Sequence, residues 1–392
     1  MALNVVSSDR LSTNVKTSNL ATGLSSKVGE SKNLIINGAM QVAQRGTTST
    51  SEGYHTVDRW YNAVNGEDEA ATQAQIALTS SDTGPWAKGF RNAYQITNGN
   101  QTGGAGAADY SVFVQRLEAQ NLTSSGWDYT SASSYISISF WVKSSVAQNF
   151  YGRFQTVDGT AQNYTFETGA LSANTWTKVT KKIPGNANIT IDNNNDKGLE
   201  LTFVQFYGTD RTGTRPLDAW AAYASATRTP DMTSTWWTTN DATFAVTGVQ
   251  LEVGDTATEF EHISYGDELV RCQRYCQRVY LRAYSATAQA LSDSTCTCPI
   301  YLETEMRGEP TITLPNTTSQ NAAGKIAFTN HTGSWPATHG TLSGTYVTTS
   351  KFNVDGTGFT SSSFGAAGNA IELYASSNAD GTRPYILCEA EL

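Results

Sequence analysis

The sequence predicts an all-β fold: an antiparallel β-sandwich, then one short helix and a smaller β-domain. Two patterns carry this prediction. In YISISFWVK, residues 135–143, apolar and polar side chains alternate with the period of a half-buried strand. A second alternating segment, residues 150–166, is divided by Asp158-Gly159, which is a tight-turn signal typical of a hairpin.

Further strands are expected across residues 33–262. The segments 177–183 and 201–206 alternate in the same way. The run 242–254 indicates a long closing strand, in which Gly248 marks a bulge. About eight short strands separated by turns are typical of an antiparallel sandwich.

The pattern changes after residue 262. Ser264-Tyr-Gly-Asp267 is a capping-box pattern, which marks the start of a helix. The following apolar side chains share one helix face: Leu269, Cys272, Tyr275, Cys276 and Val279. Beyond this helix we expect strands at 277–284, 295–303, 311–314, 325–328, 371–374 and 385–392. These strands predict a smaller C-terminal β-sandwich.

Residues 1–32 are polar and carry only scattered apolar positions, too few for a core of their own. We interpret them as an extended N-terminal arm that attaches the protein to a partner. The predicted organisation is this arm, a sandwich over 33–262, a linking helix over 263–280 and a C-terminal domain over 281–392.

The composition argues against several classes of protein. Charged residues make up 16% of the chain and the net charge is −9, so general binding to a nucleic-acid backbone is not expected. No apolar stretch approaches the roughly 18 residues of a membrane helix, and the N-terminus lacks a signal-peptide pattern. The five cysteines, an odd number, are expected to be thiols. We therefore expect a soluble protein made in the cytosol.

The segment NLIINGAMQVAQRG, residues 33–46, raises a question about its Asn37-Gly38 pair. Such a pair between apolar runs is a hairpin signal, but the flanking runs are too short for two good strands. The alternative is a kink or bulge inside a first strand. There, Gly38 lets the backbone bend and Asn37 tolerates a positive φ.

Together with residues 54–60, this segment resembles the opening of a family of bacteriophage virion proteins, tail-fibre-like and common in marine and cyanobacterial phages. The resemblance recurs over 246–262, continues over 264–275 and reaches 306–313. It implies a jelly-roll β-sandwich like those of carbohydrate-binding modules, in which the first and last strands lie side by side. On this resemblance, the Asn-Gly pair is a kink within the first strand.

The sequence shows no catalytic constellation. A zinc-protease motif, a P-loop and a G-x-S-x-G elbow are all absent, so we expect a non-enzymatic protein without a cofactor. A weak calcium candidate is formed by Asp192, Asn194 and Asp196, which mimic the first three ligands of a calcium loop. Lys197 stands where that loop needs glycine, and an Asx-rich turn is the alternative.

Four cysteines offer the donor atoms of a zinc site. Cys272 and Cys276 share a helix face, and Cys296 and Cys298 share one side of a strand. Their spacings are poor for a zinc knuckle, and buried thiols commonly serve as small apolar groups. We therefore predict no metal site here.

The aromatic region 215–237 is the predicted glycan-binding surface. Its candidate residues are Trp220, Tyr223, Trp236, Trp237 and Asp218. Flat rings stack on the apolar faces of sugars, and a carboxylate accepts hydrogen bonds from hydroxyls. The alternative is that these rings fill the core or a subunit contact, because tryptophan is highly buried on average.

The resemblance implies a phage virion structural protein that is tail-fibre-like and recognises a host-surface glycan for adsorption. Its arm would bind other virion proteins of the tail or capsid, it would assemble as a homotrimer, and it would reside in the virion. Repeated weak sites would add up through avidity, and the low charge suits neutral glycans. The alternatives are a head fibre or capsid decoration protein, a tail adaptor or nozzle component without receptor binding, and a glycan-degrading tailspike.

Overall fold

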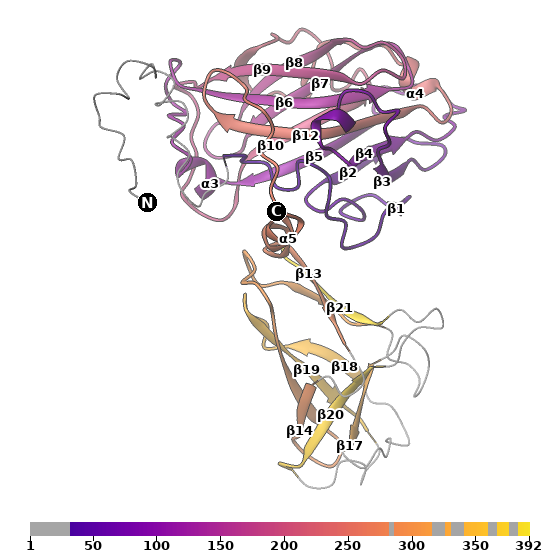
Figure 1. Ribbon diagram of the computed structural model, residues 1–392, viewed down its shortest axis with the longest axis vertical. Coiled ribbons are helices and arrows are strands. Elements are labelled where there is room, and N and C mark those ends of the chain that lie inside the picture. Colours follow the sequence, from indigo (N-terminus) through magenta and orange to yellow (C-terminus); the bar gives the residue numbers. More distant parts are fainter. Residues whose placement is uncertain (1–31, 282–285, 316–325, 331–340, 360–366, 376–382) are drawn as a thin grey trace, which may run out of the picture.

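The computed structural model describes residues 32–281, 286–315, 326–330, 341–359, 367–375 and 383–392. The predicted N-terminal arm, apart from Lys32, lies outside these residues. Two β-domains are joined by helix α5 (Tyr265–Gln273), which lies between them in Figure 1. The predicted all-β class is confirmed. None of the described helices is long and apolar enough to cross a membrane.

The first domain is a sandwich of two six-stranded sheets. Sheet A has the order β1 (Thr48–Ser49), β3 (Thr72–Ala77), β4 (Asn92–Thr97), β12 (Thr243–Val253), β6 (Tyr135–Ser144) and β9 (Thr177–Pro184). Sheet B has the order β11 (Ala219–Ala222), β8 (Gln162–Ala170), β7 (Asn149–Thr156), β10 (Lys197–Tyr207), β5 (Tyr110–Glu118) and β2 (Tyr61–Asn65). Neighbouring strands are antiparallel, as the predicted jelly roll requires.

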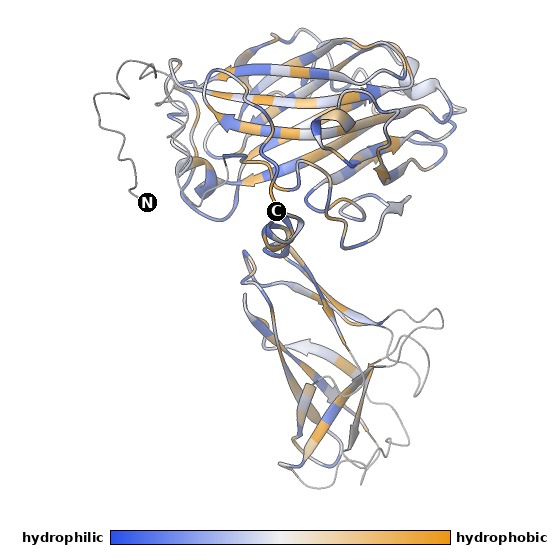
Figure 2. Cartoon of the chain, in the orientation of Figure 1, coloured by the Kyte–Doolittle hydropathy of each residue, from blue (hydrophilic) through white to orange (hydrophobic). Residues whose placement is uncertain are grey.

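The alternation seen in the sequence builds the core between the sheets. On β6, Ile136, Ile138, Phe140 and Val142 are all fully buried. They meet aromatic rings of sheet B, and the ring centres of Phe140 and Phe203 are 4.9 Å apart. Figure 2 shows hydrophobic and hydrophilic residues alternating along the strands of the jelly roll. Each strand therefore has one core face and one outer face.

The predicted hairpin and bulge are both confirmed. β7 pairs with β8 across the turn that contains Asp158-Gly159. The pairing of β12 with β6 shifts register between Thr247 and Gln250, and Gly248 within this bulge has a φ of 64°. A Cβ atom at Gly248 would come within 2.5 Å of the Phe90 ring, so the site favours glycine through both its space and its backbone.

The Asn37-Gly38 pair forms neither a hairpin nor a kink within a strand. Asn37 has a φ of 60°, and the Met40 N–H donates to the Asn37 carbonyl oxygen at 3.1 Å, which closes a turn. The Asn37 side chain fixes this turn. Its amide nitrogen donates to the Val42 and Asp58 carbonyl oxygens at 2.8 and 3.0 Å. These bonds replace the ladder bonds of a strand, which is why the predicted first strand was wrong.

The opening segment nevertheless runs beside the closing strand. The Leu34 N–H donates to the Leu251 carbonyl oxygen at 2.8 Å, and the Val249 N–H donates to the Gly38 carbonyl oxygen at 2.9 Å. The expectation that the first and last segments of the jelly roll lie side by side is therefore confirmed.

The second domain contains two further antiparallel sheets. One has the order β13 (Cys276–Tyr280), β21 (Tyr385–Glu389) and β16 (Thr311–Thr313). The other has the order β17 (Ile326–Asn330), β20 (Ala370–Ala375), β14 (Ala286–Ala290), β15 (Cys296–Tyr301), β19 (Lys351–Thr357) and β18 (Thr341–Thr345). The sequence patterns missed β14, β18 and β19. Strands β14 and β18 are short and rich in Thr, Ala and Gly, whereas β19 does alternate, with Phe352 and Val354 buried, and this signal was overlooked.

Three short helical segments complete the jelly roll: η1 (Trp86–Lys88), α3 (Ala119–Thr123) and α4 (Thr235–Thr238). Helix α5 begins as predicted, because the Ser264 hydroxyl accepts the Asp267 N–H at 3.1 Å. It ends earlier than predicted. Cys276 opens strand β13, which pairs with β21, so the linking helix over 263–280 was too long. Pairing with β21 supplies backbone hydrogen bonds to β13, and this long-range pairing outweighs the helical spacing of Cys276 and Val279.

The two domains meet around Arg59, whose side chain is 1% exposed. Its guanidinium lies 3.4 Å from the centre of the Tyr275 ring. It also donates to the Glu391 carboxylate, and to the Arg116 carbonyl oxygen at 2.7 Å. Burial by itself lowers the pKa of Arg59, but Glu391 together with Tyr275, Tyr54 and Cys272 outweighs this and raises it. The cation is thus held charged inside the joint.

Glu118 makes a second connection across the joint. This fully buried carboxylate accepts hydrogen bonds from Arg274 at 2.8 and 2.9 Å and from the Tyr275 hydroxyl at 2.5 Å. Burial by itself raises the pKa of Glu118, but the bonds from Arg274 and Tyr275 outweigh it and lower the pKa. The C-terminal end of α5 is therefore fixed to the jelly roll.

The contact between Gly38 and β12 predicts a strong effect of a single methyl group. A Cβ atom at Gly38 would lie 2.1 Å from the Val249 carbonyl oxygen, which is backbone and cannot rotate away. We expect Gly38→Ala to lower the free energy of unfolding by about 3 kcal/mol, measured by urea denaturation. Gly308→Ala is the control, because its Cβ would meet nothing within 4 Å. Equal stability of the two variants would contradict this packing.

Candidate functional site

The two strongest rings of the predicted glycan surface lie in the core. Trp236 and Trp237 are both fully buried. The Trp237 ring stacks on Phe206 with centres 5.2 Å apart, and its indole N–H donates to the Gly104 carbonyl oxygen at 2.9 Å. A ring with no exposed face cannot stack on a sugar. The prediction that Trp236 and Trp237 bind glycan was therefore wrong.

The other predicted residues lie at the edge of sheet B. Trp220 on β11 packs against Tyr164, and its indole N–H donates to the Pro184 carbonyl oxygen at 2.6 Å, so it serves the packing between the sheets. Asp218 is exposed and lies 3.4 Å from Lys181. Tyr223 is partly exposed. Ligand binding by Asp218 and Tyr223 stays a prediction.

Hydrogen bonds to the backbone explain why the outer face of β8 is not an exposed binding surface. Arg215 donates to the Asn163 carbonyl oxygen on β8 at 2.9 Å. Thr165 and Asn163 on the same strand donate to the Arg228 carbonyl oxygen at 2.9 and 3.2 Å. The segment that carries Arg215 and Arg228 therefore lies across the outer face of β8 and covers it.

The weak calcium candidate has a structural role. The Asn194 side-chain oxygen accepts the Asp196 N–H at 3.0 Å, which is an Asx turn, and Asp196 faces Arg307 at 3.9 Å. The neighbouring Asn195 amide donates to the Arg307 carbonyl oxygen in the second domain. Asp192 is bound through its N–H to the Asp158 carboxylate. The loop therefore supports the contact between domains.

Within the described ranges, no group of three or more His, Cys, Asp or Glu side chains is arranged to hold a metal ion. All five cysteines are buried and free. Burial raises the pKa of Cys298 and of Cys388 to about 12, so these sulfurs stay protonated thiols. They act as small apolar groups of the core.

A cavity of about 200 Å³ opens on the outer face of sheet A. We call it the aromatic pocket. Its lining residues are Lys88, Phe90, Ser139, Trp141, Lys178, Gly248, Glu259, Phe260 and His262. They come from β6, β9 and β12 of sheet A and from two segments that cross this sheet, one around 88–90 and one around 259–262. The pocket thus combines aromatic rings with hydrogen-bonding and charged groups.

The strand period of β6 places Trp141 in this pocket. The even-numbered residues of β6 from 136 to 142 point into the core, so Ser137, Ser139 and Trp141 point outward. Trp141 pairs with Lys178 on β9 and with Thr247 on β12, and its ring is partly exposed. An aromatic side chain on the outer face of a central strand is the feature that defines the site.

A cluster of three rings forms one wall of the aromatic pocket. The ring centres of Phe90, Phe260 and His262 are 4.8–5.0 Å apart from one another. The His262 ring nitrogen Nε2 lies 2.8 Å from the Lys88 carbonyl oxygen, which orients the imidazole. Because Phe90 is buried and His262 is exposed, the wall passes from an apolar base to a polar rim.

Asp82 holds in place the segment that leads to Lys88 and Phe90 in the wall of the aromatic pocket. Its carboxylate accepts hydrogen bonds from Lys143 at 2.8 Å, from the Trp176 indole at 2.9 Å and from the Thr79 N–H at 3.0 Å. Burial by itself raises the pKa of Asp82, but these bonds outweigh it and lower the pKa to about 2. The anchored segment brings Gly84 against the Trp141 ring, where a Cβ atom would come within 2.6 Å.

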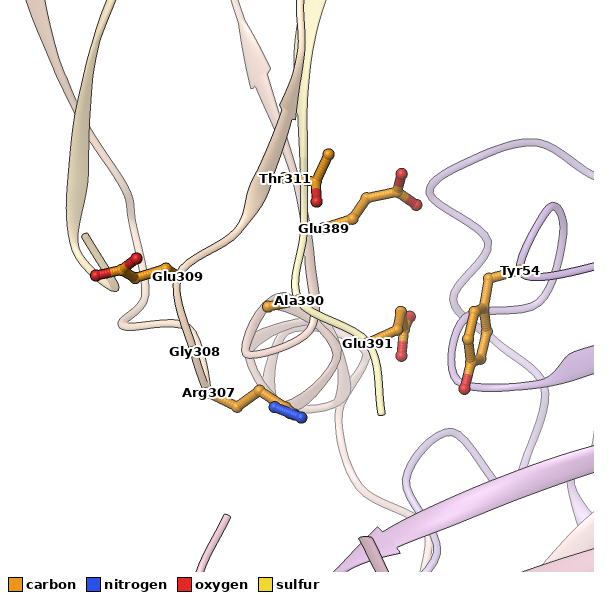
Figure 3. Close-up of a pocket in the computed structure, with 8 residues that line it drawn as sticks. All are labelled: Tyr54, Arg307, Gly308, Glu309, Thr311, Glu389, Ala390 and Glu391. Atoms are coloured by element: carbon orange, nitrogen blue, oxygen red, sulfur yellow. The ribbon is translucent and has the colours of Figure 1, made fainter. Parts of the chain in front are cut away.

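A larger cavity of about 440 Å³ lies between the two domains. Figure 3 shows its lining residues, which include Tyr54 of the jelly roll and Arg307, Glu389 and Glu391 of the second domain. Glu389 and Glu391 are already bound by Arg45 at 2.7 and 3.0 Å. Because these charges serve the joint and only one aromatic ring lines the space, the aromatic pocket is the better candidate.

Sequence reasoning placed the aromatic site in region 215–237 and overlooked Trp141, although a signal for this ring was present. In the strand pattern of residues 135–143, the outward positions are Tyr135, Ser137, Ser139, Trp141 and Lys143. A tryptophan at an outward position among mostly polar residues is expected to expose its ring. The segments that complete the pocket are distant in sequence, so their contribution left no local pattern.

No protein-family model matches the sequence, and no curated protein matches it. Among solved structures, an enzymatically active domain of tailspike protein 4 of bacteriophage CBA120 is 12% identical with a TM-score of 0.31, covering 57% of this chain and 22% of that chain. This chain thus spans about a fifth of that tailspike chain. The family 11 carbohydrate-binding module of a Clostridium thermocellum cellulase is 15% identical with a TM-score of 0.25, covering 55% and 98%. A xylan-binding domain of family 22 is 10% identical with a TM-score of 0.28, covering 56% and 99%.

The anchoring by Asp82 predicts a defined pH dependence. The pKa of this carboxyl in the folded protein lies below its ordinary value of about 3.9, so its stabilising bonds are present above pH 4 and are lost as the pH falls towards 2. We expect Asp82→Asn to lower the melting temperature at pH 7, and the difference from the wild type to shrink between pH 4 and pH 2.

The control is Asp210→Asn, which removes an exposed carboxylate after β10. It should melt like the wild type at every pH. A melting difference for Asp82→Asn that is unchanged from pH 7 to pH 2 would show that the carboxylate charge does not hold the segment.

Proposed function

We propose that this protein is a non-enzymatic adhesion component of a bacteriophage particle, and that the aromatic pocket holds a sugar of the host surface. The observation that carries the proposal is Trp141, an aromatic side chain on the outer face of a central strand at the base of a cavity. Sugar rings have apolar faces that stack on such rings, and hydroxyls that bond to the polar groups around them.

The dimensions of the aromatic pocket support a small ligand. Its volume of about 200 Å³ is below the roughly 300–1,000 Å³ of sites for drug-sized molecules, so it suits one sugar unit of a longer glycan. Ser139 at the base and Lys88, Lys178 and Glu259 at the rim supply donors and acceptors for hydroxyl groups.

The virion role rests on the sequence resemblance over residues 33–46, 54–60, 246–262, 264–275 and 306–313. In this proposal the N-terminal arm, residues 1–32, binds other virion proteins, and the chain assembles as a homotrimer. A pocket that holds one sugar unit binds weakly, and three or more copies on one particle raise the avidity through effective concentration.

We expect Trp141→Ala to weaken glycan binding by about tenfold or more. The melting temperature should fall moderately, because the partly exposed ring also packs against the buried cluster that includes Phe90 and Trp176, and the variant should stay folded at the temperature of the binding measurement. Binding is measured by isothermal titration calorimetry of the full chain with a panel of purified bacterial and plant polysaccharides. Tyr301→Ala is the control, because it removes a ring that is 70% exposed in the second domain. Tyr223→Ala tests the region predicted from sequence.

Unchanged binding by Trp141→Ala, or loss of binding by Tyr223→Ala alone, would exclude the aromatic pocket as the site. Antibody labelling of phage particles locates the chain: label at the tail supports the proposal, and label on the capsid would indicate a head fibre. Release of reducing sugar from host envelopes would indicate a glycan-degrading tailspike.

A further inference from the structure

Three lysines lie in or near the aromatic pocket on the outer face of sheet A, although the whole chain has a net charge of −9. Lys88 and Lys178 line the pocket, and Lys182 lies further along β9. The carboxylate that lines the pocket is Glu259, whose side chain is 76% exposed and lies 3.4 Å from Lys88. Glu252 on β12 is paired with Ser137, points to the same outer face and lies 3.9 Å from Lys32. The feature that matters is therefore the pair of lysines on β9, and not the net charge of the face.

The pairing of β6 with β9 sets the direction of two of these lysines. Trp141 is paired with Lys178, and Ser137 is paired with Lys182. Because Trp141 and Ser137 point outward, their partners Lys178 and Lys182 point to the same outer face. The two lysines are four residue steps apart on β9, which places them about 13 Å apart along the sheet edge. Both are exposed.

Neither lysine takes part in an ion pair within the described part of the chain. Lys143, Lys181 and Lys197 each lie within 3.4 Å of a carboxylate. Lys178 has no such contact there, and Lys182 is placed 4.4 Å from the centre of the Tyr135 ring. An exposed ammonium group next to a stacking ring can give its hydrogen bonds to an anionic group of a ligand.

We propose that the aromatic pocket selects an anionic glycan, a polysaccharide whose repeating unit carries a carboxylate or a sulfate, and that Lys178 and Lys182 determine this specificity. The inference rests on the proposed binding of sugar at Trp141. One sugar unit occupies the pocket, and the chain extends along β9 so that its anionic groups meet the two ammonium groups. This replaces the neutral glycan expected from the low overall charge.

The test uses matched pairs of polysaccharides that differ only in charge: polygalacturonate against its methyl ester, and dextran sulfate against dextran. Affinities of the full chain are measured by titration calorimetry in 50 and 500 mM NaCl. We expect the charged member of at least one pair to bind about tenfold more tightly at low salt, and the preference to shrink at high salt. The carboxylate pair and the sulfate pair distinguish the two sources of charge.

The double variant Lys178→Gln with Lys182→Gln should lose this preference and keep the wild-type melting temperature. Lys351→Gln, which removes an exposed lysine on β19, should keep the preference. Equal affinities within each pair for the wild type, or a preference that survives in the double variant, overturn the inference. If Trp141→Ala weakens binding but the lysine variants keep the charge preference, the sugar site is supported and the anionic specificity is refuted. If Trp141→Ala has no effect on binding, the sugar site itself is refuted.

Discussion

The buried guanidinium of Arg59 is the constraint on which the arrangement of the two domains depends. An uncompensated charge inside a protein costs several kcal/mol, so each of its partners must be in place. Those partners come from three parts of the chain: Arg116 on β5, Tyr275 after α5 and Glu391 after β21. The charge of Arg59 is therefore balanced only when the jelly roll, the helix and the C-terminal segment are assembled together, which makes the joint a folded unit and not a loose linker.

The segments 33–46, 264–275 and 306–313 meet at this joint. Asn37 donates its N–H to the Glu268 carboxylate at 2.8 Å. Gln44 donates to the Cys276 carbonyl oxygen at 2.7 Å, which connects the first segment to the start of β13. The Arg307 N–H donates to the Arg274 carbonyl oxygen at 2.9 Å. These residues therefore mark an architectural contact, whereas Gly248, Glu259, Phe260 and His262, in the segment 246–262, line the aromatic pocket.

Local physics made part of the fold predictable. The period of β6, the turn at Asp158-Gly159 and the cap at Ser264 each act within a few residues, so their signals are complete in the sequence. The burial of Trp236 and the helix end before Cys276 depend on partners far along the chain, Gln148 and β21 among them, and no local pattern contains them. The aromatic pocket failed prediction for the same reason, although the outward position of Trp141 was present in the strand pattern.

A rigid joint matters because the aromatic pocket is small. A ligand that fits about 200 Å³ buries little surface, and association itself costs translational and rotational freedom, so one pocket alone supports only weak binding. Several copies help only if their pockets can engage one surface at the same time, and a flexible connection adds an ordering cost at each engagement. The contacts of Arg59 and Glu118 connect the jelly roll to the second domain, so in the proposed adhesion role they would reduce this ordering cost.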